Sequence, residues 1–173
     1  MPETWISEEM RAAVGREVGD PVVSFPISLS DIRKWAQAVY YPEPPPPCYW
    51  DESDESTRRA GGIVAPQEFN PFAWMSAAGP PRPGAPTRIG PGPEQALGIA
   101  PPATSEMLNG GLDVTYTRTP MRPDDVITSV GALTEYRERQ GRLGLMLFTI
   151  TEDRWTNQNG ETVKTSRNIL IRY

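Results

Sequence analysis

Residues 143–173, LGLMLFTITEDRWTNQNGETVKTSRNILIRY, decide the fold class of this 173-residue chain. Apolar side chains recur at short intervals in two runs, Leu143 to Trp155 and Val163 to Tyr173, and Asn159-Gly160 lies between them. An Asn-Gly pair between two such runs is typical of a β-hairpin, because both residues tolerate the positive φ angles of a tight turn. The chain is therefore predicted to end in two antiparallel strands.

Two further strands are predicted before this hairpin. Residues Gly111 to Arg118 alternate apolar and polar side chains, and Asp125 to Tyr136 carry a similar pattern. Turn-forming pairs, Pro123-Asp124 and Gln140-Gly141, separate the runs. Four successive strands joined by short turns predict an antiparallel meander in the last third of the chain.

The first forty residues carry helical patterns at two places. Residues 5–15 are amphipathic, and their acidic first turn suits the positive end of a helix dipole. Residues 21–29 alternate as a strand would. Ser28 and Asp31 have the spacing of a capping box, so a second helix is expected to begin near Leu29 and to stop at Tyr41-Pro42.

The middle of the chain changes character twice. Residues 61–78, GGIVAPQEFNPFAWMSAA, are apolar on nearly every side, so a helix here would be a central buried one. Residues 79–105 are rich in Pro and Gly and are expected to form a long loop or insertion. Together these patterns predict one α+β domain over residues 1–173, in which a curved antiparallel sheet wraps around a central apolar helix.

The chain contains no histidine and only one cysteine, Cys48. The missing histidine excludes every mechanism in which this chain supplies an imidazole as general base, nucleophile partner or metal ligand. A single cysteine cannot form an intramolecular disulfide, and without His or paired Cys no zinc site is expected. We expect no metal and no cofactor.

The net charge of −5 argues against a nucleic-acid backbone or an anionic membrane as the main partner. No run of apolar residues approaches the length that a bilayer span requires. Residues 1–19 lack the apolar core of a signal peptide. The sequence therefore predicts a cytoplasmic protein.

Five stretches that span most of the chain carry a family resemblance, and the most specific of them begins Gly-Gly-Ile-Val-Ala-Pro at residue 61. They resemble the MaoC-like hot-dog dehydratases, particularly the N-terminal-type dehydratase domain of actinobacterial (R)-specific enoyl-CoA hydratases. The resemblance implies a hot-dog fold and an acyl-CoA tunnel shared between two subunits. The five stretches are Asp31 to Tyr41, Gly61 to Phe69, Gly110 to Arg118, Met121 to Asp125, and Ile150 to Asn168.

The chain departs from that family in the loop after the first long helix. Catalytic members carry an Asp and, about five residues later, a His that together orient a water and shuttle a proton. Here the loop is Tyr40 to Pro47, with four consecutive prolines and neither Asp nor His. The resemblance therefore points to the non-catalytic subunit of a heteromeric hydratase that is inactive alone. Its partner would be a histidine-bearing MaoC-like subunit, in a heterodimer or a dimer of heterodimers. The substrate would be a long-chain or bulky 2-enoyl-CoA, and a steroid-derived ester is the first candidate.

Two other functions stay open at this stage. One is a homodimeric hot-dog module that binds acyl-CoA or lipid and has a regulatory or scaffolding role. The other is a self-sufficient hydratase in which Glu43 or Asp113 acts as the base, although a carboxylate in a proline-bounded loop is more often solvated.

The candidate substrate-binding residues fall into two groups. An aromatic group surrounds the proline run, and it either lines a pocket for a wide fused-ring acyl group or plugs a vestigial site. An apolar group opens the predicted central helix, where backbone N–H groups of residues 62–64 would face a thioester oxygen unless the glycines only allow close packing. The candidates are Tyr40, Tyr41, Trp50, Gly62, Ile63, Val64, Phe69 and Trp74.

Arg167 and Asn168 are the candidates for CoA binding. The resemblance implies this role, because relatives often contact CoA phosphates from the last strand, and a guanidinium matches a pair of phosphate oxygens. The alternative is a salt bridge on an edge strand. Arg82 and Arg88 in the Pro/Gly-rich loop are further candidates for the nucleotide.

Overall fold

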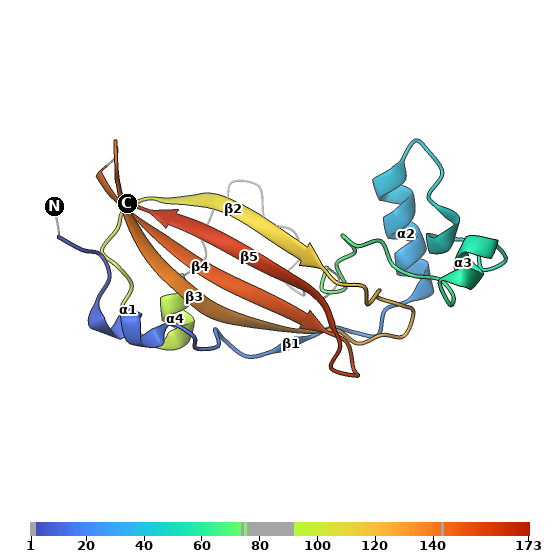
Figure 1. Ribbon diagram of the computed structural model, residues 1–173, viewed down its shortest axis with the longest axis horizontal. Coiled ribbons are helices and arrows are strands. Elements are labelled where there is room, and N and C mark those ends of the chain that lie inside the picture. Colours follow the sequence, from blue (N-terminus) through green and yellow to red (C-terminus); the bar gives the residue numbers. More distant parts are fainter. Residues whose placement is uncertain (1–2, 74, 76–91, 143) are drawn as a thin grey trace.

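The computed structural model describes residues 3–73, 75, 92–142 and 144–173. One five-stranded antiparallel sheet, in the order β1-β3-β4-β5-β2, forms the centre of this part of the protein. Helices lie near both ends of the sheet, α1 and α4 at one end and α2 and α3 beyond the other (Figure 1). The predicted α+β class is confirmed. No helix of the described residues is long and apolar enough to cross a membrane.

The two helices expected in the first forty residues are present. Helix α1 spans Glu8–Ala13, and the hydroxyl of Ser7 accepts a hydrogen bond from Met10 N–H. Helix α2 spans Leu29–Tyr40, and the hydroxyl of Ser28 accepts from Asp31 N–H, as the capping spacing predicts. Of the strand expected over residues 21–29, only β1, Val22–Val23, pairs with the sheet.

Four long strands follow, but their order differs from a simple meander. Strands β3 (Thr128–Gly141), β4 (Gly144–Thr156) and β5 (Thr162–Arg172) are consecutive neighbours. Strand β2 (Met107–Tyr116) pairs with β5 and not with β3, so the predicted four-strand meander is wrong at this point. The segment between β2 and β3 makes this possible, because it crosses the end of the sheet and turns at Asp124, whose φ is +68°.

The helix expected over residues 61–78 does not form in its described part, which is residues 61–73 and 75. Gly61 and Gly62 have φ angles of +78° and +113°, which no helix accepts. Ala65 N–H instead donates to Met121 O, and Pro66 and Pro71 interrupt any helical ladder. An apolar segment without 3.6-residue periodicity packs here as irregular chain.

The Pro/Gly-rich stretch expected as a loop over residues 79–105 contains a short helix, α4, Pro93–Leu97. Glu94 and Leu97 of this helix are buried, and the Glu94 carboxylate pairs with the Arg172 guanidinium at the end of β5. Burial of both residues against the sheet explains why this stretch is ordered helix. The remaining elements are η1 (Pro47–Tyr49) and α3 (Glu55–Arg59).

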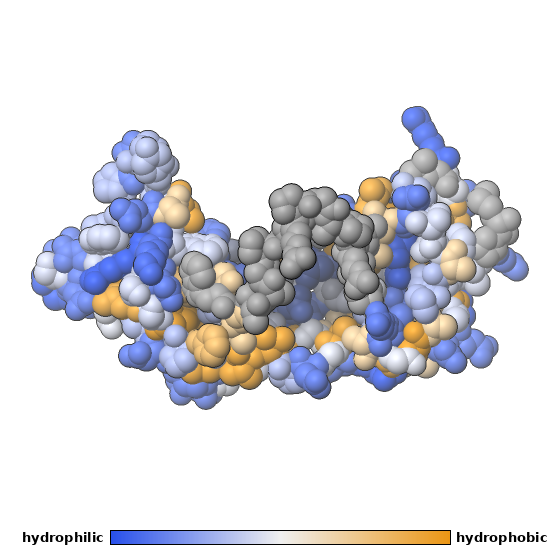
Figure 2. Space-filling view, turned by 180° about the vertical axis from the view of Figure 1, so that it is seen from behind, coloured by the Kyte–Doolittle hydropathy of each residue, from blue (hydrophilic) through white to orange (hydrophobic). Residues whose placement is uncertain are grey.

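Two apolar clusters hold these parts together. The larger lies where the sheet meets residues 29–62, which we call the head, and it includes Ile32, Ile63 and Phe69. The smaller joins α1 and α4 to the sheet through Ala13, Leu97 and Leu133. The face of the sheet that carries Leu133 and Arg172 is called the inner face below, and the opposite one the outer face. Seen from behind, apolar areas gather near the head and along the sheet, while much of the remaining surface is hydrophilic (Figure 2).

Candidate functional site

A pocket of about 420 Å³ lies between the head and the end of the sheet. Its polar groups come from both sides, since Cys48 and Tyr49 belong to η1, and Tyr116 and Lys164 to strands β2 and β5. Two registers place these strand residues together, because Lys164 is the direct partner of both Tyr116 and Trp155. We call this the junction pocket, and it is lined by Cys48, Tyr49, Val64, Ala65, Gln67, residues 116–121, Val163 and Lys164.

Lys164 provides a cation at this pocket. Its Nζ lies 3.6 Å from the centre of the Trp155 ring and 6.0 Å from that of Tyr116. The Trp155 ring is itself held by the edge of Phe72, with ring centres 4.8 Å apart. Burial lowers the pKa of the Lys164 ammonium, and the negative charges of Glu68 and Asp153 oppose that effect.

The two phenols and the thiol of the pocket stay protonated at neutral pH. Burial, together with the neighbouring Tyr40 hydroxyl, raises the pKa of Tyr49 to about 12. Burial also raises the pKa of Tyr116 and that of the Cys48 thiol. These groups can donate hydrogen bonds, but neither phenol is a base at neutral pH and the thiol is a poor nucleophile.

A second pocket, of about 480 Å³, lies on the head around the proline run. Two of the predicted binding residues meet there, Tyr41 and Trp50, whose surfaces are 82% and 43% exposed. Arg33 fixes Trp50, because its Nε and Nη2 atoms donate to the Trp50 carbonyl at 3.1 and 3.0 Å. Tyr40 is half-buried beside Tyr49, with ring centres 6.0 Å apart, and does not line this pocket. We call it the proline pocket, and it is lined by Gln37, Tyr41, Pro42, Glu43, Pro44, Pro45, Pro47, Trp50 and Asp51.

The predicted row of free backbone donors at residues 62–64 is not present. Gly62 N–H donates to Thr57 O, and Val64 N–H donates to Cys48 O, at 3.0 and 3.1 Å. Arg122 additionally binds the carbonyls of Ala60 and Gly61. The expectation that the N–H groups of Gly62 and Val64 face a thioester oxygen is therefore wrong, because folding already pairs them.

The other apolar candidates are separated from one another. Ile63 is 5% exposed and Phe69 1% exposed, both within the larger apolar cluster, and the Phe69 ring packs edge-on against Trp35. Val64 lines the junction pocket. Trp74, Arg82 and Arg88 lie outside the described residues.

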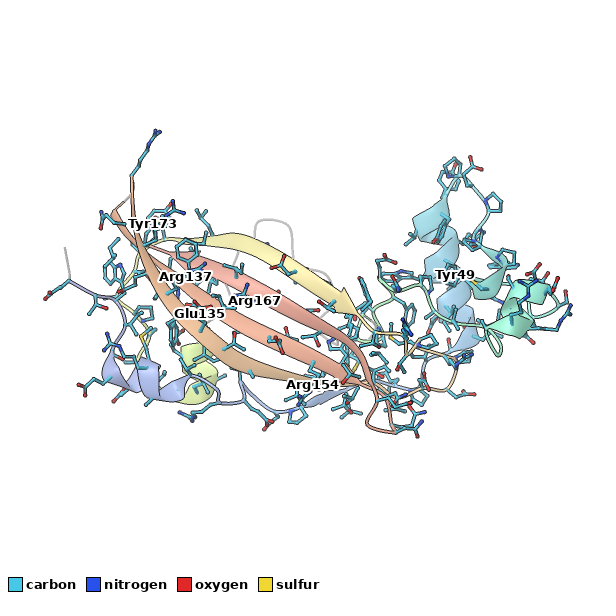
Figure 3. The ribbon with its side chains drawn as sticks, in the orientation of Figure 1. Tyr49, Glu135, Arg137, Arg154, Arg167 and Tyr173 are labelled. Atoms are coloured by element: carbon cyan, nitrogen blue, oxygen red, sulfur yellow. The ribbon has the colours of Figure 1, made fainter. Side chains whose placement is uncertain are left out.

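Arg167 and Asn168 are adjacent in sequence but point to opposite faces of β5. On the outer face, Arg167 pairs with Glu135 at 3.3 Å and lies 3.9 Å from Asp113 (Figure 3). On the inner face, Asn168 Nδ2 donates to the Asp153 carboxylate at 2.8 Å. Burial raises the pKa of Asp153. The structure does not bring Arg167 and Asn168 to one ligand, and Arg167 makes the salt bridges that the alternative predicts, although β5 is not an edge strand.

A hollow of about 440 Å³ on the inner face lies between the two ends of the sheet. It is bordered by the amides of Asn109 and Asn168 and the hydroxyls of Thr149 and Thr151. Next to it, Arg172 donates to both carboxylate oxygens of Glu94, and Tyr136 OH donates to Glu94 Oε1 at 2.6 Å. Among the residues placed by the structure, no cluster of three metal-ligating side chains occurs.

The sequence-based candidates did not include Lys164 or Asp153. A strand lysine is ordinarily solvent-exposed, and its burial depends on Trp155 and Tyr116, which come from two other strands. One signal was present in the sequence, since Lys164 is one of only two lysines, the other being Lys34.

Comparisons with known proteins agree with this geometry. The family model described as "FAS1-like, dehydratase domain region" matches residues 12–166. Similar solved structures include the ChsH1–ChsH2 complex from Mycobacterium tuberculosis, at 20% identity and a TM-score of 0.60 over 89% of this chain and 83% of that one. A HadBC (3R-hydroxyacyl-ACP dehydratase) complex from the same organism is similar at 16% sequence identity and a TM-score of 0.57, over 92% of this chain and 96% of that one. The R-hydratase PhaJ1 from Pseudomonas aeruginosa is similar at 18% sequence identity and a TM-score of 0.54, over 92% of this chain and 81% of that one. A comparison with curated sequences gave no significant match. The structural likenesses establish the hot-dog fold.

Proposed function

Because the chain belongs to the FAS1-like dehydratase-domain family of MaoC-like hot-dog proteins, we propose that it is the non-catalytic subunit of a heteromeric (R)-specific 2-enoyl-CoA hydratase. The observation that carries the proposal is the loop from Tyr40 to Pro47. It contains neither Asp nor His, and the whole chain lacks histidine. A histidine-bearing MaoC-like partner would supply the acid and base.

Among the described residues, the titratable groups nearest the two pockets do not replace that pair. The phenols of the junction pocket are protonated at neutral pH, as is its thiol, and Glu43 lies in an exposed part of the proline pocket. Asp113 is on the outer face, with a side chain 75% exposed and within 3.9 Å of Arg167. Asp153 is half-buried but accepts a hydrogen bond from Asn168 and lines neither pocket. None of these carboxylates has the apolar, ligand-facing environment of a general base.

The chemistry would then take place on the partner's residues. The partner's base would take a proton from water as the water oxygen bonds to C3 of the enoyl thioester, and a proton would be delivered to C2. The product is the (3R)-hydroxyacyl-CoA, and the reverse reaction is a dehydration. This chain would bind the acyl group and exclude water from it.

The edge strand β2 is the surface that we assign to the partner. It is ten residues long and pairs with β5 along one side. Leu108 and Leu112 on this strand are 49% and 57% exposed. A long edge strand that carries exposed apolar side chains is suited to continue into a second sheet. The solved structures of similar fold named ChsH1–ChsH2 and HadBC are complexes of two kinds of subunit, which supports a heteromer here.

The acyl group that we propose is bulky, with a steroid-derived ester as the first candidate and a long chain as the second. The proline pocket supports this, because its prolines and the Tyr41 and Trp50 rings form rigid walls around about 480 Å³. Rigid walls suit a rigid fused-ring group, since little conformational freedom is lost on binding. Asn168 on the inner face remains our candidate for direct contact with the thioester ligand, whereas Arg167 would reach CoA only from the outer face.

Co-expression tests this proposal. The purified chain alone should not hydrate 2-enoyl-CoA esters, whereas the chain co-expressed with a histidine-bearing MaoC-like protein should form a stable, active complex. Replacing the partner's histidine by alanine should abolish activity, and the two subunits should remain associated. Hydration by the isolated chain would refute the proposal. A stable homodimer that binds acyl-CoA and ignores every MaoC-like partner would favour the alternative binding module.

A further inference from the structure

We propose that the junction pocket is a binding site for the anionic group, phosphate or carboxylate, of a partly apolar ligand, and that Lys164 is the charge that binds it. The proposal goes beyond the hydratase role, because it requires neither a partner subunit nor a reaction. It assigns a ligand-binding residue that neither the sequence motifs nor the proposed function uses.

Lys164 carries a charge that has no partner among the residues that the structure describes. Lys164 is half-buried and lines the pocket, yet within the described part of the chain its ammonium makes no hydrogen bond and no ion pair within 4.0 Å. Its contact is the face of the Trp155 ring, 3.6 Å away. An aromatic face attracts a cation, but an N–H group bonds more strongly to an oxyanion than to an aromatic ring. The ammonium is therefore left with donors for an incoming anion.

The position of this charge is fixed by its surroundings. Lys164 on β5 has two direct cross-strand neighbours, Trp155 on β4 and Tyr116 on β2. All three side chains lie on the inner face of the sheet. Phe72 packs edge-on against the Trp155 indole, with ring centres 4.8 Å apart. A cation held on a strand between two aromatic rings is preorganised for binding.

The remaining walls indicate the rest of the ligand. Arg118 adds a second cation at the pocket, while Val64, Ala65, Met121 and Val163 provide apolar surface. The Thr117 hydroxyl already donates to Thr162 O, so it is committed to the fold. A pocket of about 420 Å³ with cations and apolar walls fits a ligand that is anionic at one place and apolar elsewhere.

Two carboxylates act on Lys164 through space without pairing with it. Glu68 is exposed and influences the pKa values of Tyr49, Tyr116 and Lys164, whereas Asp153 is held by Asn168. Glu68 would repel a bound anion. Its neutralisation should therefore strengthen binding, which is the opposite sign to the loss of Lys164.

Equilibrium binding to the chain without any partner tests the site. The probes are inorganic phosphate, CoA, decanoate and decanoyl-CoA, followed by calorimetry and by tryptophan fluorescence, since Trp155 adjoins the lysine. Lys164→Gln should weaken binding of the tightest anionic probe at least tenfold, Lys164→Arg should retain most of it, and Glu68→Gln should strengthen it. Lys34→Gln is the matched control, because Lys34 is the other lysine and its side chain is 71% exposed. Preference for CoA over decanoate identifies a phosphate, and the reverse a carboxylate.

A second measurement leaves the protein unmutated. Pyridoxal phosphate is an anionic aldehyde whose carbonyl condenses with a lysine amine, releasing water, and borohydride then reduces the imine to a stable amine. Peptide mapping should show that CoA or decanoate protects Lys164 and not Lys34. Equal affinities of wild type and Lys164→Gln, no binding of any probe at millimolar concentration, or no protection would overturn the proposal. The hydratase assay with a partner is independent of all these results, so either proposal can fail without the other.

Discussion

Glu94→Gln should destabilise the protein by about 3–5 kcal/mol, the range for breaking a buried ion pair from one side. Both partners are inaccessible, with Glu94 at 0% and Arg172 at 3% exposure. Arg172 Nη1 and Nη2 lie 3.0 and 2.7 Å from the two carboxylate oxygens, and the Tyr136 hydroxyl lies 2.6 Å from Oε1. Glutamine keeps the shape but presents an amide N–H₂ to the guanidinium. The variant therefore contains a buried cation without a counter-charge.

Urea unfolding followed by far-UV circular dichroism measures this loss, and thermal melting gives a second readout. For a domain of this size a loss of about 3 kcal/mol corresponds to a fall in Tm of roughly 6–12 °C. Glu55→Gln on α3 is the matched control, since Glu55 and Arg59 form a helix pair whose side chains are 71% and 73% exposed. That change should cost about 0.5 kcal/mol or less.

A double variant separates the charge from the packing. Glu94→Leu combined with Arg172→Met replaces the pair by apolar side chains, and such replacements are often close to neutral. The double variant should recover most of the stability that Glu94→Gln loses. The reasoning is refuted if Glu94→Gln costs less than about 1 kcal/mol, or if its cost equals that of Glu55→Gln.

The same pair predicts a pH dependence. Burial by itself raises the pKa of Glu94, but the hydrogen bonds from Arg172 and Tyr136 outweigh it, so the net pKa lies below the ordinary value. The unfolded chain therefore binds this proton at a higher pH than the folded one. The stabilisation is complete above the unfolded pKa, about 4.3, and is lost as pH falls through the lower folded pKa. Unfolding free energies between pH 3 and 7 should show an acid loss that Glu94→Gln lacks, and parallel curves would contradict this.

Three further substitutions test the fold and the proposed interface. Ser28→Ala removes the N-terminal cap of α2 and should cost about 1 kcal/mol in urea unfolding, whereas exposed Ser30→Ala should cost less. Phe69→Ala removes one ring from the larger apolar cluster and should lower the free energy of unfolding by about 3–5 kcal/mol. A loss below about 1 kcal/mol would mean that the ring is not packed as described. Leu112→Lys on the exposed edge of β2 should leave the Tm unchanged and weaken association with the MaoC-like partner at least tenfold in sedimentation, and undiminished association would remove β2 from the interface.

The sequence predicted best what depends on neighbouring residues. The Ser28 cap and the Asn159-Gly160 turn are local, so spacing alone located them. The neighbour of β2 is a long-range property: the alternation of residues 111–118 shows that a strand exists but not that β5 is its partner. The helix predicted over the segment from Gly61 to Ala73 was wrong for a different reason. Its apolar composition predicts burial correctly, but burial without a 3.6-residue period does not select a helix over irregular chain.

The predicted binding residues show the same division. Tyr41 and Trp50 are close in sequence, and the structure places them in one pocket. Arg167 and Asn168 are adjacent, yet adjacency on a strand guarantees opposite faces, so their pairing as one CoA site conflicted with the strand that the sequence itself predicted. Lys164 could not be found from its neighbours in the chain, because its burial is created by β2 and β4.

The inner face carries a basic residue near each end of β5, and the two have different surroundings. The Arg172 guanidinium donates to both carboxylate oxygens of Glu94 and to the Thr149 hydroxyl, so it is committed to joining α4 to the sheet. Lys164, eight residues away on the same face and thus about 26 Å along the strand, meets aromatic rings in place of a carboxylate. One cation of β5 is therefore ion-paired with a buried carboxylate, whereas the other is half-buried and lines a pocket. The contrast therefore separates a charge used for folding from one available to a ligand. The proposed anion site lies at the end of the sheet next to the head.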